Sequence, residues 1–355
     1  MTARKKILSE ILVVTMLSGI VTFFVFTSSA KPLTLHSGQR MLMGTLGKIV
    51  VVTDDMETGR DAIKAAFEQL NRLEKMMSSY IEDSQVAKIN SQAYDQKVKV
   101  TDEVFEVLRE SAAVSELSGG AFDITIGPAK DLWQRAQDTN QMPGSDALTD
   151  ARSKVGYKKL ILDTDRHTVR FAVLGMKIDL GGIAKGYAID KAIDAIKAKG
   201  IKGAMVDIGG DIACFGTAPD GKKNWHIGLQ NPDSTPENAQ PQLLLKLEVS
   251  QAAVATSGDY QRFVEVAGRR LSHIIDTGTG FGSGELKSVT IICGTAMRAD
   301  ALATAVTVLG PQKGLRLIET LDGVEGILIP KEPNCKIIKT SGADTYISKD
   351  RHINK

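Results

Sequence analysis

Residues 177–215 constrain the fold more than any other segment of the chain. Their order predicts a strand end, a glycine turn at Gly181 and Gly182, an amphipathic helix that Gly200 ends, and a second strand running into another glycine turn. Glycines let a backbone approach a ligand closely, and a helix start offers N–H groups beside the cation of Lys185. The segment therefore indicates an anion site, most simply for phosphate. A strand–turn–helix unit with glycines for tight packing explains the same residues at least as well.

The composition and motifs of the chain exclude several classes of protein. The chain has 355 residues, of which 43% are hydrophobic and 24% charged, as in globular proteins with a real core. A formal net charge of +2, without a basic stripe, predicts that no nucleic acid is bound. The glycine segment matches neither the P-loop nor the Rossmann motif. Three cysteines follow no metal-ligand spacing, and two of them lie in apolar runs that predict buried thiols: Cys214 and Cys293.

Residues 1–30 have the pattern of a secretory signal or a membrane anchor. Basic residues at 4–6 precede an apolar run, and a small-residue patch follows in which cleavage after Ala30 could occur. The run approaches the ~20 residues that span a bilayer, so an uncleaved anchor stays open. No cysteine lies near its end to carry a lipid. Because the basic residues come first, the body is expected outside the cytoplasm in either case.

Residues 31–355 are predicted to form one large body with a polar C-terminal tail. Hydrophobic periodicity predicts helices at 59–77, 84–90, 101–117 and 296–309, and another from 312. Strands are predicted at 42–52, 160–162, 168–173, 225–229, 243–249, 252–260, 273–276, 289–293 and 326–329, and a polar surface excursion at 134–150. Because helices and strands mix without strict alternation, the pattern favours an α+β fold with mixed or antiparallel sheets and packed helices.

Asp300 and Thr304 are four residues apart on a predicted helix, so their oxygens share a face. A carboxylate and a hydroxyl together suit a hard cation such as Mg²⁺, which takes few protein ligands and keeps waters or substrate phosphate. Taken on spacing alone, the better explanation is a solvated aspartate and a threonine bonded back to the carbonyl four residues earlier.

Other polar candidates adjoin turns. His273 lies three residues before Asp276 and could be a general base or part of a structural hydrogen-bonded pair. Residues 256–260, including Ser257, are dense in donors and fit a polar ligand or an Asx-type turn. The remaining candidates are acids beside turns and side chains able to stack on a planar ring, each with a capping or packing alternative: Asp123, Asp179, Asp211, Met43 and Tyr80.

The order of these motifs is more specific than any one of them. MGT at 43–45, SSY at 78–80, SGGAFDIT at 118–125, DLGGIAKGYAID at 179–190 and VDIGGDI at 206–212 come first. VATSGDY at 254–260, SHIID at 272–276 and TAMRADALATAV at 295–306 follow. Together they resemble the ApbE family of bacterial FAD:protein FMN transferases, from about residue 43 to 328. Ile124 and Thr277 stand where proline is common in that family, which affects loop conformation rather than the polar residues.

The resemblance implies an activity, a cofactor and a location. The expected reaction is Mg²⁺-dependent transfer of FMN from FAD to a Thr or Ser hydroxyl of an acceptor flavoprotein, through a phosphoester bond and with release of AMP. The expected fold is the ApbE-like, T-fold-like body. Acceptors would include membrane respiratory complexes of the NADH:quinone reductase type. The body would lie on the periplasmic side of the bacterial inner membrane.

The resemblance also assigns residues. The metal would be held by Asp300, Thr304 and the backbone carbonyl of Gly182. Mg²⁺ held at Asp300 and Thr304, together with Lys185, would stabilise charge on the diphosphate, while His273 accepts or orients the acceptor proton. Ser257 is expected at the cofactor with the positions that line FAD: Met43, Tyr80, Ala121, Phe122, Asp123, Asp179, Lys185 and Ile274.

Three other functions fit the same motifs. Water could replace the acceptor hydroxyl, which would make the chain an FAD hydrolase that yields FMN and AMP. A passive extracytoplasmic flavin-binding protein would need the pocket but no metal at Asp300 and Thr304. An acceptor flavoprotein would itself carry covalent FMN.

Overall fold

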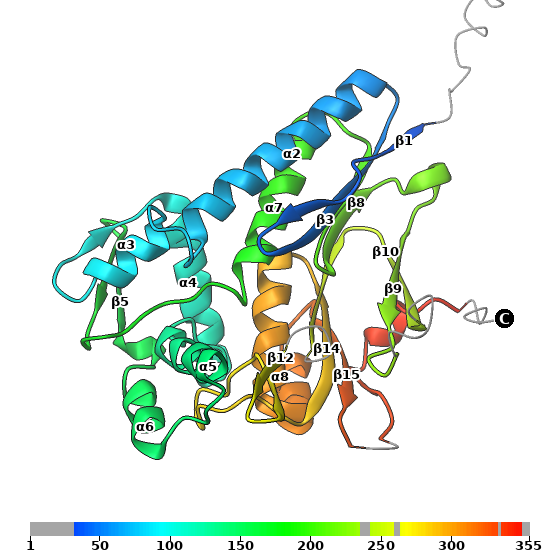
Figure 1. Cartoon of the computed structure of the whole chain (residues 1–355). Helices are drawn as coiled ribbons and strands as arrows, with labels where there is room; N and C mark the ends of the chain where they lie inside the picture. Colours follow the sequence, from blue (N-terminus) through cyan, green and yellow to red (C-terminus); the bar gives the residue numbers. More distant parts are fainter. Residues whose placement is uncertain (1–31, 235–241, 259–262, 333–334, 350–355) are drawn as a thin grey trace, which may run out of the picture.

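The centre of the molecule is a nine-stranded antiparallel sheet. The computed structural model describes residues 32–234, 242–258, 263–332 and 335–349. The strand order is β1-β3-β7-β8-β11-β14-β15-β16, and β2 pairs with β3 off this path (Figure 1). The strands are β1 (Leu33–His36), β2 (Arg40–Leu42), β3 (Thr45–Thr53), β7 (Gly203–Ile208), β8 (Asp211–Gly216), β11 (Ala252–Gly258), β14 (Leu286–Cys293), β15 (Glu325–Pro330) and β16 (Ile338–Lys339).

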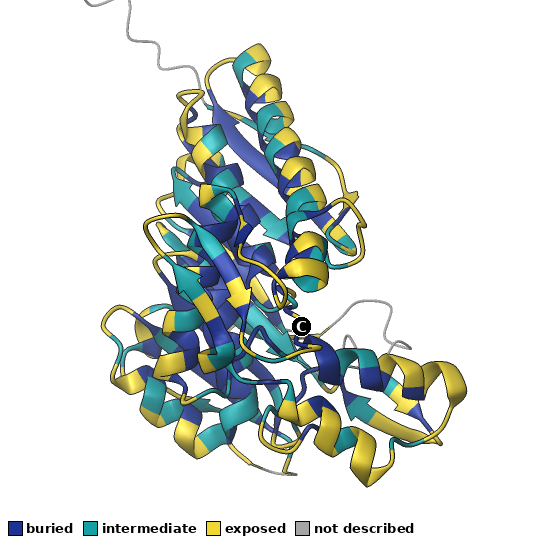
Figure 2. Ribbon diagram, turned by 90° about the vertical axis from the view of Figure 1, so that its left-hand side faces the viewer, coloured by how far each residue is buried: buried dark blue, intermediate teal, exposed yellow. Residues whose placement is uncertain are grey.

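Alternating side chains of the sheet enter two different cores. Ile49 and Val51 of β3 join the larger core with α2 (Met56–Met77), α7 (Ala184–Lys197) and α8 (Ala296–Glu319). Val50 and Val52 face the opposite core with β9 (Trp225–Gln230) and β10 (Leu243–Val249). Helices therefore cover one face of the sheet and a hairpin covers the other. Burial is concentrated on the strands and inner helix faces, with exposed residues along the outer faces (Figure 2).

Residues between α2 and α7 form a side layer on the left of Figure 1. Two of its helices begin at side-chain caps, because Ser84 and Thr101 each accept a backbone N–H at the starts of α3 and α4. Asp55 does the same for α2, which begins three residues before its predicted start. The layer consists of α3 (Gln85–Gln92), β4 (Val98–Lys99), α4 (Asp102–Leu117), α5 (Gly127–Thr139), α6 (Ser145–Ser153), β5 (Leu160–Asp163) and β6 (Thr168–Phe171).

The stretch 134–150 is largely exposed, as predicted, but α5 and α6 occupy most of it, so it is helical rather than a loop. The helix α5 packs Ala129, Trp133 and Ala136 on Val266 of a hairpin that the sequence did not predict, β12 (Phe263–Val266) and β13 (Arg269–Ser272). Trp133 Nε1 also donates to Gly280 O at 2.7 Å. Only a narrow apolar stripe of α5 is buried, and its polar outer face gave the segment the composition of a loop.

Several other boundaries differ from the prediction. The predicted strand end at 177 is an isolated bridge between Lys177 and Ile126, and 273–276 is a loop with one bridge from Ile275. The two predicted C-terminal helices form α8, interrupted at Gly310 with φ 74°. Instead of a polar tail, the segment up to residue 349 adds β16 and packs on β10 through Ile347.

The α+β class is confirmed, with antiparallel pairing throughout the described strands. Within the described ranges no helix is both long and apolar enough to cross a bilayer. The predicted signal or anchor at 1–30 lies outside the described residues. The same holds for Asp259 and Tyr260 of the VATSGDY motif and for residues 350–355 of the predicted tail.

Candidate functional site

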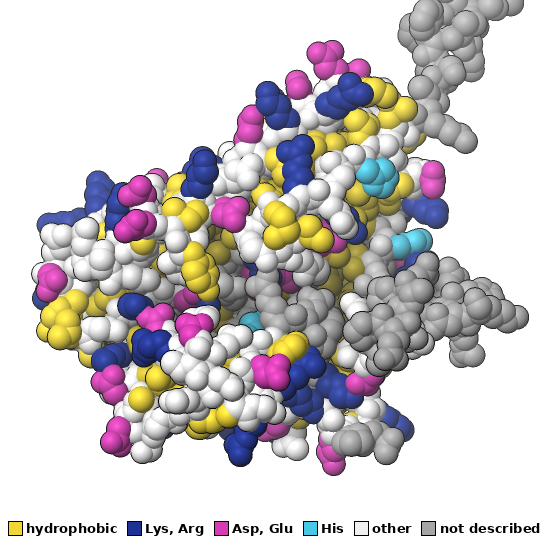
Figure 3. Space-filling view, in the orientation of Figure 1, with side chains coloured by type: hydrophobic (Ala, Val, Ile, Leu, Met, Phe, Trp, Pro, Cys, Tyr) yellow, Lys and Arg dark blue, Asp and Glu magenta, His cyan; other side chains and the backbone are white. Residues whose placement is uncertain are grey.

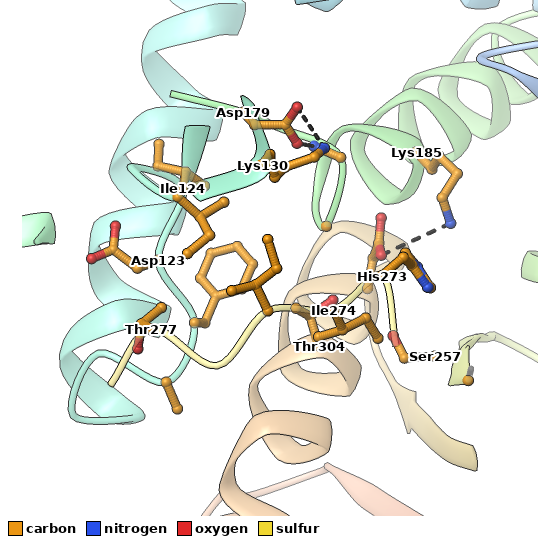
Figure 4. A pocket seen from close by; sticks show the side chains of 18 of the residues that line it. Asp123, Ile124, Lys130, Asp179, Lys185, Ser257, His273, Ile274, Thr277 and Thr304 are labelled. Atoms are coloured by element: carbon orange, nitrogen blue, oxygen red, sulfur yellow. Dashed lines mark hydrogen bonds and ion pairs between the residues drawn. The ribbon is translucent and has the colours of Figure 1, made fainter. Parts of the chain in front are cut away.

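A cavity of about 200 Å³ opens where the side layer meets the end of the central sheet. Its walls come from the loop after α4, the glycine turn before α7, the end of β11, the loop after β13 and the start of α8 (Figure 4). Most predicted site residues line it: Ala121, Phe122, Asp123, Asp179, Gly182, Lys185, Ser257, His273, Ile274, Asp300 and Thr304.

The three predicted metal ligands come together in the cavity. A Cβ on Gly182 would lie 3.0 Å from Thr304 Oγ1, so the glycine turn rests against α8 beside this hydroxyl. Thr307 of the same helix bonds back to Ala303 O at 2.8 Å, but the Thr304 hydroxyl has no hydrogen-bond partner among the described residues. The back-bonded alternative for Thr304 is therefore wrong, and its oxygen is available to a ligand.

Asp300 is 4% exposed and makes few contacts for a buried carboxylate. Its Oδ2 accepts Gly186 N–H at 3.1 Å, and its Oδ1 lies 4.0 Å from Lys185 Nζ. Burial raises the pKa of Asp300, against the opposing charge of Lys185 and with a further upward push from Asp211. A cation here would offset the free-energy cost of burying this carboxylate in its charged form.

Some of the backbone N–H groups at the start of α7 are already bonded to other parts of the protein. No side chain caps it, but Gly186 N–H already donates to Asp300, which takes one of the groups expected to bind phosphate. A Cβ on Gly186 would overlap the carbonyl oxygen of Ala296, so only glycine lets α7 and α8 meet this closely. Asp190 completes the junction, since its two oxygens accept Ala296 and Met297 N–H at 2.8 and 2.9 Å. Burial raises the pKa of Asp190 to about 6.

Asp211 belongs to the site, although the sequence indicated only a turn acid. Its carboxylate is 1% exposed and pairs with Lys185, while its Oδ1 accepts Thr256 N–H at 3.1 Å. Lys185 is therefore held between two buried carboxylates, Asp211 and Asp300. The glycine turn before Asp211 was a signal for it, because such a turn lets the acid point back toward the start of α7.

Lys130 is a second residue that the sequence did not single out. Its Nζ lies 2.7 Å from Asp179 Oδ2 in the cavity wall. Asp179 also accepts Gly181 N–H at 2.9 Å and the Ser79 hydroxyl at 3.2 Å. Burial pushes the pKa of Asp179 up, but Lys130 and these donors outweigh it, and the pKa is lowered. No local motif marks Lys130, because its partner is far away in the chain.

Asp123 lines the cavity wall but uses its carboxylate internally. Its Oδ1 accepts the N–H and hydroxyl of Thr125 at 2.8 and 2.7 Å, and its Oδ2 accepts Tyr157 N–H at 2.6 Å. Burial raises its pKa, opposed by these hydrogen bonds. Figure 4 shows the carboxylate directed away from Ile274 and Thr304.

Met43 and Tyr80 lie outside the lining of this cavity, and their contact with FAD stays a prediction. The Met43 N–H donates to Glu74 Oε1 at 2.9 Å, and its side chain packs on the larger core. Tyr80 follows the end of α2 and is 87% exposed. Their neighbours reach the site instead, since Thr45 lines the cavity and Ser79 bonds to Asp179.

His273 reaches the cavity wall, next to Ile274 (Figure 4). Asp276, its predicted partner, accepts Gly278 N–H at 2.8 Å and the Thr279 hydroxyl at 3.0 Å, so it closes its own turn. Within the described residues, no group of three or more His, Cys, Asp or Glu side chains could hold a metal. A cation would need the hydroxyl, carbonyl and substrate ligands that Mg²⁺ accepts.

The face of the molecule shown in Figure 3 has no basic patch among its described residues. On the face shown in Figure 3, basic and acidic side chains are interspersed over the described residues rather than gathered by sign. The net charge of +2 agrees with this distribution.

Comparison with known proteins identifies the family. An FAD:protein FMN transferase of Treponema pallidum (strain Nichols) is 33% identical over 308 residues, covering 83% of this chain and 84% of that protein. One of the same name from Haemophilus influenzae is 30% identical, covering 82% and 84%. The crystal structure of the ApbE protein of Thermotoga maritima MSB8 matches with a TM-score of 0.80 and 30% identity, over 90% of this chain and all of that one.

A second solved structure, the flavin transferase ApbE from Vibrio cholerae, matches with a TM-score of 0.77 and 27% identity, over 89% of this chain and 99% of that one. The model described as the ApbE family matches residues 43–328, the span over which the sequence motifs occur. The resemblance drawn from those motifs is confirmed, and the chain belongs to the ApbE family.

Proposed function

We propose that this chain is an FAD:protein FMN transferase that requires Mg²⁺ and transfers FMN to a Thr or Ser hydroxyl of an acceptor flavoprotein. The observation that carries the proposal is the meeting of the Thr304 hydroxyl, the buried Asp300 carboxylate and the Gly182 turn in one cavity. The names of the relatives support the transferase class. The metal and the phosphoester bond are what the family resemblance implies, and the oxygen ligands at Asp300, Thr304 and Gly182 are of the kind that Mg²⁺ accepts.

The charge of the cavity supports a cation. Among the described residues, carboxylates in or beside the cavity outnumber ammonium groups: Asp123, Asp179, Asp211 and Asp300 against Lys130 and Lys185. The diphosphate of FAD would add more negative charge to a partly dry site. A divalent cation held by Asp300, Thr304 and the Gly182 carbonyl would supply the missing positive charge at the diphosphate.

The protein residues then have separate tasks in transfer. The acceptor oxygen forms a bond to the FMN-side phosphorus as the bond to the AMP-side bridging oxygen breaks, and AMP leaves. Lys185, fixed by Asp211, stabilises charge that builds up on the diphosphate. His273, which lines the cavity, takes the proton of the acceptor hydroxyl or orients that hydroxyl.

A gel assay tests the proposal. The body from about residue 31 is mixed with FAD, Mg²⁺ and an acceptor flavoprotein domain, and denatured bands are examined for flavin fluorescence. We expect a fluorescent acceptor band with wild-type protein, lost with chelator. Thr304→Val should lower the rate about 10- to 100-fold and raise the Mg²⁺ requirement, because it removes one metal ligand. Thr307→Val is the matched control on the same helix, since its hydroxyl only bonds back to Ala303.

Other outcomes would point elsewhere. Release of FMN and AMP with no labelled acceptor would indicate an FAD hydrolase. FAD binding that withstands chelator and Thr304→Val, with no turnover, would indicate a passive flavin-binding protein. Fluorescence on the chain itself would indicate an acceptor flavoprotein.

We also propose that the body works on the periplasmic side of the inner membrane, on membrane respiratory complexes of the NADH:quinone reductase type. The support is the basic-then-apolar pattern of residues 1–30. A reporter enzyme active only outside the cytoplasm, fused after residue 349, should be active. An inactive fusion beside an active cytoplasmic reporter would contradict this location.

A further inference from the structure

Two lysines from different helices flank the glycine turn before α7. Lys130 reaches it from α5 on one side and Lys185 from α7 on the other (Figure 4). The Lys130 Nζ lies 3.7 Å from the position of a Cβ on Gly181, so this ammonium is beside the turn itself. A phosphate group resting against the turn would have a cation on each side.

Asp179 holds Lys130 in this position. The carboxylate is anchored independently, by Gly181 N–H on Oδ1 and by the Ser79 hydroxyl on Oδ2. It therefore stays in place whether or not the lysine is present. The Lys130 side chain is 36% exposed and that of Asp179 12%, so the ammonium is the more accessible end of the pair.

The two lysines differ in how much charge they can offer a ligand. Lys185 pairs with Asp211 and lies 4.0 Å from Asp300, so it is shared between two buried carboxylates. Lys130 pairs with one carboxylate at the cavity wall. Without Lys130, a diphosphate at the turn would face the bare charge of Asp179 at short range.

We propose that Lys130 is a specificity-determining residue whose ammonium bridges Asp179 and a diphosphate oxygen of the bound dinucleotide. This inference rests on the proposed function, because it takes FAD as the ligand. In this arrangement Lys130 supplies one charge-assisted contact and screens the ligand from Asp179. The contact favours flavins that carry a diphosphate over those without phosphate.

Direct binding of flavins to the purified chain tests the contact without any acceptor. Flavin fluorescence is titrated with FAD and with riboflavin, which has no phosphate, for wild type and for Lys130→Met. We expect Lys130→Met to weaken FAD binding about tenfold or more and to leave riboflavin within about twofold. Lys130→Arg, which keeps the charge, should restore much of the FAD affinity.

Lys177→Met is the matched control. Lys177 pairs with Asp131, the residue after Lys130 in α5, and belongs to the same chain segment as Asp179, but it does not line the cavity. This substitution removes an ion pair of the same kind between the same two segments. FAD affinity should remain at the wild-type value, which separates a ligand contact from general loosening of α5.

A double-mutant comparison tests whether Lys130 screens the diphosphate from the charge of Asp179. Lys130→Met should weaken FAD binding less in an Asp179→Asn background than in wild type, because no bare carboxylate is then exposed. Equal losses in both backgrounds would overturn the bridging arrangement. Equal losses for FAD and riboflavin, or a Lys130→Met chain that binds FAD as the Lys177→Met chain does, would overturn the contact itself.

The two proposals fail differently. If wild type binds FAD with the predicted Lys130 dependence but labels no acceptor, the inference holds and the transferase proposal fails. If wild type labels the acceptor and Lys130→Met changes neither binding nor labelling, the transferase proposal holds and the inference is wrong.

Discussion

The cavity contains two buried aspartates on opposite walls, and they are held very differently. Asp123, on the loop wall, receives three donors from Thr125 and Tyr157 and is directed away from the cavity. Asp300, on the α8 wall, receives one backbone N–H and has Lys185 Nζ at 4.0 Å. Burial raises the pKa of both carboxyls. Burial alone therefore does not distinguish the two acids, and we infer from the unmet hydrogen-bonding capacity of Asp300 at the cavity that it is the functional one.

The strongest test of this contrast is Asp300→Asn. The amide keeps the shape of the side chain but removes the charge that would hold a cation, so we expect acceptor labelling to fall about a thousandfold or more. The labelling rate at saturating FAD measures this, with thermal unfolding as a check on folding. Labelling within about tenfold of wild type would place the metal elsewhere.

Asp123→Asn should lower the stability of the fold and leave the labelling rate nearly unchanged. One face of the amide would present N–H₂ to Tyr157 N–H, where the carboxylate now accepts a hydrogen bond at 2.6 Å. We expect a loss of about 1–3 kcal/mol in the free energy of unfolding. The labelling rate per folded molecule should stay within a few-fold of wild type. Urea unfolding gives the first quantity, and a rate loss as large as that of Asp300→Asn would erase the distinction between the two walls.

The last test of the contrast concerns pH. Because the pKa of Asp300 is raised in the folded chain, its contribution to metal-free stability is present below the ordinary carboxyl pKa and is lost as the pH rises through the raised value. Mg²⁺ must displace that proton, so half-saturating Mg²⁺ should rise about tenfold per pH unit below the raised pKa.

Thermal unfolding with and without Mg²⁺ measures this linkage. The stabilisation by Mg²⁺ should be larger near pH 8 than near pH 5. The Asp300→Asn chain should show little Mg²⁺-dependent shift at either pH. A metal shift in wild type that does not change with pH would argue against Asp300 as the titrating ligand.

Much of the fold follows from local signals in the sequence. Hydrophobic periodicity predicts α2, α3 and α4, and apolar alternation predicts most strands of the central sheet. The helix α5 was not predicted, because its buried stripe packs on a distant hairpin rather than on its sequence neighbours. The loop at 273–276 looked like a strand because Ile274 and Ile275 are buried by tertiary contacts.

The site was predictable where glycine and acid motifs carry information along the chain. Asp300, Thr304 and Gly182 lie in such motifs and come together as expected. Lys130 was not predictable, because it acts through an ion pair with Asp179 across the fold. Met43 and Tyr80 lie in motifs too, but motif membership does not say whether a side chain or its neighbour reaches the cavity.

The junction of α7 and α8 bears on how this protein can diversify. Gly186 fits against Ala296, and Asp190 holds the first N–H groups of α8, so both halves of the proposed metal site are set before any ligand arrives. Because these contacts fix the junction of α7 and α8, we expect few amino-acid substitutions to be tolerated there. The outer faces of α5 and of the β12–β13 hairpin are exposed and carry none of the proposed metal ligands. Substitutions that adapt the protein to new acceptors can accumulate there while the chemistry stays the same.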